Sequence, residues 1–252
     1  MVSRLLEAMP QENIVYFGDT GRVPYGSRSR AIIERYAGQD IRFLLSRDVK
    51  LIIAACGTVS SVAPHVGERS GLPFIEVVSP AAKAAASATR NGKIGVIGTA
   101  ATIASGAYKA RIQALRPDFA VFQNACPLFV PLVESGWFAP DDTVVRLTAQ
   151  RYLEPLKAQG IDTLILGCTH YPILTPVIRD IMGEDVALVD TGETTAQAAA
   201  AYLRENGMLA ARREGADHFF VSDTADSFAH TAGILLGKSV DFDVSRVEIE
   251  RF

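Results

Sequence analysis

The sequence predicts an α/β protein with two pseudo-symmetric lobes, each built on a parallel β-sheet flanked by helices. Three observations support this fold class. Short continuous apolar runs alternate with helical patterns, as in parallel sheets that are covered on both faces. Two blocks of sequence recur in the same order in both halves of the chain, and a cysteine ends one apolar run in each half.

The strand predictions rest on short runs rich in β-branched and aromatic residues. These runs cover 13–18, 49–56, 74–78, 93–99, 119–124, 163–168, 186–190 and 218–222. Helical patterns lie between them, most clearly at 28–46, 104–115, 143–158 and 194–206. Strands that alternate with helices are typical of parallel sheets.

The repeat is carried by two pairs of aligned segments. Residues 4–17 align with 111–123, and residues 51–66 align with 163–178. The second pair places Cys56 over Cys168. Loop insertions account for the small drift in the offset. An active site is therefore expected in the cleft between two related lobes.

The repeat predicts a first lobe of residues 1–79 plus 192–252 and a second lobe of residues 80–191. In the second lobe a strand at 93–99 precedes the helix that aligns with residues 4–9, and the first lobe lacks its counterpart. Either the first lobe lacks a strand by design or the sequence begins about 15 to 20 residues late, and we expect the second. A parallel sheet without that strand has a bare hydrogen-bonding edge.

Composition excludes several function classes. The chain of 252 residues has a formal net charge of −3. It has no basic stripe of the kind that binds nucleic acid. No apolar stretch reaches the roughly 18 residues of a membrane span. Three cysteines form no disulfide framework, and the first residues do not read as a signal peptide. We therefore expect a cytoplasmic protein with reduced thiols and no nucleic-acid or membrane partner.

Cys56 and Cys168 are the strongest candidates for chemistry. Each ends an apolar run that is followed by polar residues and a predicted helix. Ligands of open α/β sheets bind at the carboxyl ends of strands, and a helix N-terminus there favours thiolate. Thr58, Thr169 and His170 add polar groups at the same strand ends. A lone cysteine is more often a buried hydrophobe, but a pair at matching repeat positions indicates chemistry.

Other candidate groups are weaker. Cys126 has no repeat partner and is predicted to be core, and no ligand spacing indicates a metal site. The small-residue turn at 98–106 lacks both common phosphate-binding patterns, yet Thr99 and Thr102 could bind a carboxylate there. His170 could be a core histidine or could tune Cys168 as an acid or base. The loop that carries Tyr25 is either a tight turn or a ligand-facing lip.

Taken together, these segments resemble the glutamate racemase family, cofactor-independent isomerases that supply D-glutamate for peptidoglycan, and so for the bacterial cell wall and cell shape. The matching segments are GDTGRVPYG, LIIAACGT, GVIGTAATIASGAY, ACPLFVPLVESG, LILGCTHYP, LVDTGETTA and HFFVSDTADSFAHTAGILLG. The resemblance covers nearly the whole chain. It implies racemisation of glutamate without a cofactor, and members of the family often form homodimers.

By this resemblance, Cys56 acts on D-glutamate and Cys168 on L-glutamate, with His170 and Glu134 assisting as catalytic residues. The predicted substrate-binding residues, including two from the small-residue turn, are Pro24, Tyr25, Gly26, Gly57, Thr58, Thr99, Thr102, Thr169 and His170.

Two departures from the family pattern weaken the Cys56 side. The opening strand and its Asp-Ser turn are absent, and Gly57 stands where the family usually has Asn. Glycine leaves only backbone donors and a looser turn, and one lost hydrogen bond to a charged group costs about 1.5 to 3 kcal/mol. The alternatives are a racemase of aspartate or another small acid, a non-catalytic or regulatory relative, and a cysteine hydrolase.

Overall fold

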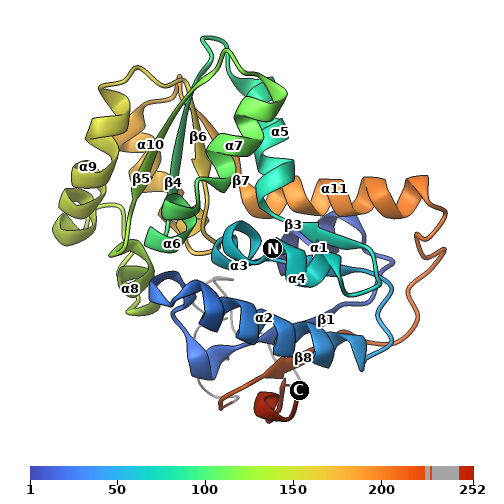
Figure 1. The fold of residues 1–252 in the computed structure, drawn as a ribbon. Helices are drawn as coiled ribbons and strands as arrows, with labels where there is room; N and C mark the ends of the chain where they lie inside the picture. Colours follow the sequence, from blue (N-terminus) through green and yellow to red (C-terminus); the bar gives the residue numbers. More distant parts are fainter. Residues whose placement is uncertain (225–227, 229–243) are drawn as a thin grey trace.

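The computed structural model describes residues 1–224, 228 and 244–252. Its described strands form three sheets, all parallel, of which one has four strands and two are smaller. Figure 1 shows the four-stranded sheet of the second lobe, with helices on both faces, beside the small sheets of the first lobe. The predicted α/β class with two lobes is confirmed.

The second lobe is built on strands in the order β5-β4-β6-β7. They are β4 (Lys93–Gly98), β5 (Ala120–Ala125), β6 (Thr163–Leu166) and β7 (Ala187–Asp190). Successive side chains of a strand point to opposite faces. Leu164 and Leu166 therefore join one hydrophobic core, while Ile165 joins the other. Burial on both faces explains why these strands read as unbroken apolar runs.

Helices cover both faces of this sheet (Figure 1). One face carries α8 (Phe129–Glu134), α9 (Thr143–Lys157) and α10 (Thr175–Met182), and the other carries α5 (Val78–Ala88) and α7 (Ala107–Leu115). The single helix predicted over 104–115 is wrong. Gly106 has a φ of 67° and separates α6 (Ala100–Ser105) from α7, because a left-handed residue ends a helix.

The first lobe contains the two smaller sheets. One has the order β1-β8-β9, with β1 (Val15–Gly18), β8 (His218–Val221) and β9 (Val244–Arg246), and the other pairs β2 (Ile52–Ala54) with β3 (Phe74–Glu76). All eight predicted strands are present. β9 was not predicted, because its three residues include a single apolar one.

The first-lobe helices pack around these sheets. Among the described residues they are α1 (Val2–Ala8), α2 (Arg30–Leu45), α3 (Gly57–Val62), α4 (Pro64–Glu68) and α11 (Thr191–Glu205). The 3₁₀ turns within the same ranges are η1 (Thr20–Arg22), η2 (Tyr25–Ser27), η3 (Tyr171–Leu174) and η4 (Ile249–Arg251). Leu5 and Met9 pack against the alanine-rich face of α11. Helix α11 follows β7 of the second lobe and contacts both α1 and α5, so it connects the lobes. Within the described ranges, no helix combines the length and apolar character needed to cross a membrane.

Candidate active site

A cavity of about 1860 Å³ is lined by residues of both lobes. Cys56 follows β2 and Cys168 follows β6, and both side chains line this cavity. The carboxyl ends of parallel strands are the usual ligand-binding edge of open α/β sheets. The structure therefore brings the two predicted thiols to one cavity.

Cys168, His170 and Glu134 form a chain of polar contacts on the second-lobe side. The His170 Nδ1 atom lies 3.8 Å from the Cys168 Sγ atom, and Nε2 lies 3.3 Å from the Glu134 carboxylate. Burial lowers the pKa of His170, but hydrogen bonds with Cys168 and Glu134 outweigh burial and raise this pKa to about 9. At neutral pH the ring is therefore an imidazolium, whose Nδ1 atom faces the Cys168 sulfur.

The two thiols differ in their local structure. Cys56 caps the N-terminus of α3, as predicted. Burial nevertheless raises the pKa of its thiol, and backbone N–H groups of Val59 and Thr58 offset only part of this rise. The expected preference for thiolate at Cys56 is therefore wrong, because desolvation of the charged form outweighs the partial charge of a six-residue helix. Cys168 is followed by a turn and η3, which leads directly into α10, and not by the predicted α-helix.

Threonine hydroxyls connect the lobes beside the cysteines. Thr58 of α3 and Thr99, which caps α6, have their Oγ1 atoms 2.9 Å apart. The Thr99 hydroxyl also lies 3.0 Å from that of Thr102. Thr102 is buried behind Thr99 and does not line the cavity, so the structure does not bring this predicted substrate-binding residue to the site. All the other predicted site residues line the cavity.

Gly57 occupies a crowded position between the lobes. It is the first residue of α3, and a Cβ atom there would lie 2.2 Å from the carbonyl oxygen of Gly167. The expectation of a looser turn at Gly57 is therefore wrong. The missing side chain lets the backbones after β2 and β6 approach one another, which places both cysteine turns against the same cavity.

Three charged residues that the sequence analysis missed support the loop that carries Tyr25. The Arg22 guanidinium lies 2.7 Å from Asp19 and 2.9 Å from Asp40. The Tyr25 hydroxyl donates to Asp19 and also contacts Asp40 at 3.1 Å. Burial and the neighbouring Asp19 charge raise the pKa of Asp40 to about 7. The loop is thus both a pair of tight turns and a wall of the cavity. The buried ion cluster of Asp19, Arg22 and Asp40 holds it in place. The spacing of three residues between Asp19 and Arg22 could have predicted their ion pair. Asp40 lies on α2, and nothing in the sequence indicated that it joins them.

Replacing Asp40 by Asn should flatten the pH dependence of stability. A folded-state pKa of about 7, against 3.8 for the unfolded chain, means that the native state holds an extra proton between these values. Stability from this group therefore falls as pH rises from about 4 to 7, by on the order of 4 kcal/mol at most. Urea denaturation at pH 5 and pH 8 measures the difference. The exposed Asp180→Asn variant is the control, and equal pH slopes in the Asp40→Asn variant and the unmodified protein would refute the prediction.

Cys126 lies away from the cavity and is fully buried in the second-lobe core, as predicted. Of the other histidines, His65 lies beside Glu34 with side chains that are 33% and 34% exposed, and His230 lies outside the described residues. Across the described part of the chain, no group of three or more His, Cys, Asp and Glu side chains could hold a metal ion.

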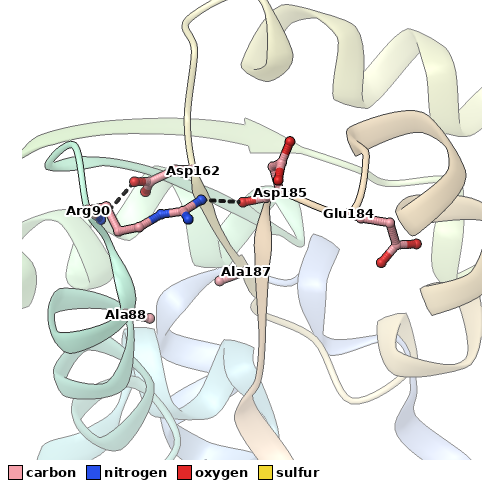
Figure 2. A pocket seen from close by; sticks show the side chains of 6 residues that line it. All are labelled: Ala88, Arg90, Asp162, Glu184, Asp185 and Ala187. Carbon is pink, nitrogen blue, oxygen red and sulfur yellow. Dashed lines mark hydrogen bonds between the residues drawn. The ribbon is translucent and has the colours of Figure 1, made fainter.

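A second, open pocket of about 320 Å³ lies at the amino ends of β6 and β7, away from the cysteines (Figure 2). Arg90 bridges it by donating from its guanidinium to the Asp185 carbonyl and from its backbone N–H to Asp162. Asp162 accepts further hydrogen bonds from Thr89 and Asn91. Its charge is thus already satisfied by the protein.

The chain is similar to known proteins over most of its length. The family model described as Asp/Glu/Hydantoin racemase matches residues 2–199. The chain belongs to this racemase family. It is 44% identical over 252 residues to the glutamate racemase of Geobacter metallireducens, and the aligned region covers 99% of this chain and 92% of that protein.

Solved structures of racemases share the fold. The glutamate racemase isoform RacE1 from Bacillus anthracis matches with a TM-score of 0.93 and 35% identity, over 98% of this chain and 92% of that one. The glutamate racemase from Francisella tularensis, solved in complex with D-glutamate, matches with a TM-score of 0.91 and 34% identity, over 100% of this chain and 93% of that one. This racemase therefore has a family fold over its full described length.

Proposed function

We propose that this racemase interconverts L- and D-glutamate by a two-thiol mechanism. One observation carries the proposal: Cys56 and Cys168 come from matching strand ends of the two lobes and line one cavity. Inversion at a carbon atom needs one group to remove a proton from one face and another to add a proton to the opposite face. Two pseudo-symmetric lobes supply two such groups.

In the proposed reaction, the Cys56 thiolate removes the α-proton of D-glutamate. The electron pair of the broken C–H bond stays on the α-carbon and is delocalised into the substrate carboxylate. The Cys168 thiol then donates its proton to the opposite face, which forms L-glutamate and leaves a thiolate on Cys168. The reverse reaction starts from the Cys168 thiolate. No change of oxidation state occurs, and the proton taken from one face by one thiolate is replaced on the other face by the second thiol.

His170 is proposed to set the protonation state of Cys168. Its imidazolium faces the Cys168 sulfur on one side and the Glu134 carboxylate on the other. Removal of a proton by Cys168 requires a thiolate, and a neighbouring cation stabilises that charge. We assign His170 to this role and Glu134 to the positioning of His170.

The substrate is proposed to lie between the cysteine turns. Thr58 and Thr169 follow the two cysteines and line the cavity with hydroxyl groups, and Pro24 and Gly26 line it as well, with Gly26 packed against Thr99. Hydroxyl and backbone N–H donors suit the carboxylates of an acidic amino acid. Thr102 is left out of this assignment because it lies behind Thr99.

The cellular role follows from the product. We propose that the enzyme supplies D-glutamate for peptidoglycan, works in the cytoplasm, where thiols stay reduced, and assembles as a homodimer.

The proposed activity is tested by exchange of the α-proton in deuterated water. Each glutamate enantiomer should lose its α-proton and form its mirror image, as measured by NMR and chiral chromatography. Exchange with aspartate but not glutamate would redirect the assignment to aspartate. Exchange of neither would refute a racemase that uses these thiols.

Replacing Glu134 by Gln should weaken the reaction that starts from L-glutamate. Loss of the carboxylate removes one of the groups that raise the His170 pKa, so the alkaline limb of the pH–rate profile should move to lower pH. Because Glu134 is 39% exposed, we expect at most about a tenfold loss in kcat/KM. Glu184→Gln, at the far end of the lobe and 88% exposed, is the matched control. An unchanged pH profile in the Glu134→Gln variant would contradict the role given to Glu134.

A further inference from the structure

The two lobes meet backbone to backbone beside the cysteines. Gly57 is the first residue of α3 in the first lobe, and Gly167 follows β6 in the second lobe. A Cβ atom on Gly57 would lie 2.2 Å from the carbonyl oxygen of Gly167 and 3.2 Å from its carbonyl carbon. Only hydrogen therefore fits between the two backbones. Because Gly57 follows Cys56 and Gly167 precedes Cys168, this contact joins the two cysteine turns.

The Gly167 side of this contact is held in place by the second lobe. The Gly167 N–H donates to the Ile97 carbonyl of β4 at 2.8 Å. A Cβ atom on Gly167 would lie 2.6 Å from that carbonyl oxygen and 3.2 Å from the ring of Tyr108, which is fully buried. A close-packed interior of this kind absorbs an added atom only by moving its neighbours. An atom added at position 57 would therefore push the lobes apart.

Two further contacts between the lobes lie beside this one. The Oγ1 atoms of Thr58 and Thr99 are 2.9 Å apart. A Cβ atom on Gly26 of η2 would lie only 2.6 Å from the Cβ atom of Thr99. Gly57 and these three residues all line the cavity. The first lobe thus rests on the second through small residues, and their size sets the separation of the lobes at the active site.

The separation of the lobes matters because inversion needs both thiols at one carbon atom. One sulfur must reach the α-carbon from one face while the other faces its opposite side. Reacting atoms have to lie about 3 to 3.5 Å apart, and a misplacement of about 1 Å can cost about a hundredfold in rate. A Cβ atom at position 57 would need a distance of about 3.5 Å from the Gly167 oxygen, which moves the two turns apart by about 1 Å.

We propose that Gly57 is a positioning residue, whose missing side chain sets the lobe separation at which Cys56 and Cys168 reach the same α-carbon. The proposal rests on the two-thiol racemisation proposed above. Gly57 acts through the backbone of the Cys56 turn and not on the reacting atoms. An Asn at position 57, which is usual in the family, therefore impairs this enzyme, although its amide adds hydrogen-bond donors. The packing of this chain requires the glycine.

The test compares Gly57→Ala and Gly57→Asn with the unmodified enzyme in deuterated water. Both variants should lose about 10- to 100-fold in kcat/KM for inversion of glutamate. Exchange of the α-proton without inversion needs one thiol only, so it should fall less, and the ratio of exchange to inversion should rise. A loss of folded protein alone would lower both rates equally. The Ala variant adds the Cβ atom without an amide, so it separates the effect of space from that of hydrogen bonding.

The matched control is Gly95→Ala, which adds a crowded methyl group away from the contact between the lobes. Its Cβ atom would lie 2.4 Å from the end of the Ile161 side chain, and neither residue lines the cavity. This variant should keep the ratio of exchange to inversion of the unmodified enzyme. A higher kcat/KM in Gly57→Asn than in the unmodified enzyme, or an unchanged ratio in Gly57→Ala, would overturn the proposal.

Crystal structures of the unmodified protein and of Gly57→Ala test the lobe separation without catalysis. The Gly167 carbonyl oxygen should lie about 1 Å further from α3 in the variant. An unchanged separation would overturn the proposal. If the unmodified protein exchanged neither enantiomer, the racemase assignment would fail, and with it the part of the proposal that concerns the thiols. The crystal structures would still decide whether Gly57 sets the separation of the lobes.

Discussion

Replacing Cys168 by Ser should abolish racemisation. In the assay of α-proton exchange with deuterated water, the two enantiomers should then behave differently. L-Glutamate should keep its α-proton, because the base on its side is lost. D-Glutamate should still exchange its α-proton through Cys56, without inversion, because the opposite proton donor is missing. Removing a positioned acid or base typically costs 10²- to 10⁴-fold. Cys56→Ser should show the mirror-image defect.

The control for this pair is Cys126→Ser, which changes a buried cysteine of the second-lobe core that does not line the cavity. Both enantiomers should exchange and invert normally in this variant. Equal losses for both enantiomers in each of the two active-site variants would refute the division of roles between Cys56 and Cys168.

Replacing Arg22 by Ala should be among the most destabilising single changes in the first lobe. The Arg22, Asp19 and Asp40 side chains are only 11%, 7% and 20% exposed. Removal of the guanidinium leaves the Asp19 carboxylate in a poorly hydrated site without its cation, and it removes the cation that lowers the pKa of Asp40. Breaking a buried ion pair in this way costs about 3 to 5 kcal/mol. Urea denaturation measures the loss, which should be smaller in an Asp40→Asn background because one carboxylate fewer remains.

Arg30→Ala provides the matched comparison. Arg30 pairs with Glu34 at 2.8 Å on the surface of α2, but its side chain is 71% exposed. Exposed pairs of this kind contribute about 0.3 to 0.5 kcal/mol. Similar losses in the Arg22 and Arg30 variants would show that the buried cluster does not stabilise the loop around Tyr25.

Much of the fold was predictable because its strands are buried on both faces. Continuous apolar runs such as 93–99 and 163–168 are stable only when they are buried, and in the structure they contain β4 and β6. β9 escaped prediction because a short edge strand needs no apolar pattern. The break at Gly106 also escaped, because a single glycine inside a helical pattern does not reveal its backbone angle.

The candidate site was predictable where the repeat duplicated it. Cys56 and Cys168 could be singled out because each lobe supplies one at the same strand end. The electrostatics could not be predicted in the same way. The raised pKa of Cys56 depends on burial by surrounding segments, and that of His170 on Glu134, which lies 36 residues away in the chain. Thr102 illustrates the same limit, since one helical turn decides whether a hydroxyl faces a cavity or a neighbouring side chain.

Helix α11 has a consequence for how the molecule can move. It starts directly after β7 of the second lobe, capped by Asp190, and lies against α1 of the first lobe along its alanine-rich face. A helix that belongs to both lobes resists their sliding apart but allows rotation about its own axis. We therefore expect the two lobes to rotate relative to one another about the axis of α11, which would widen the cavity between them.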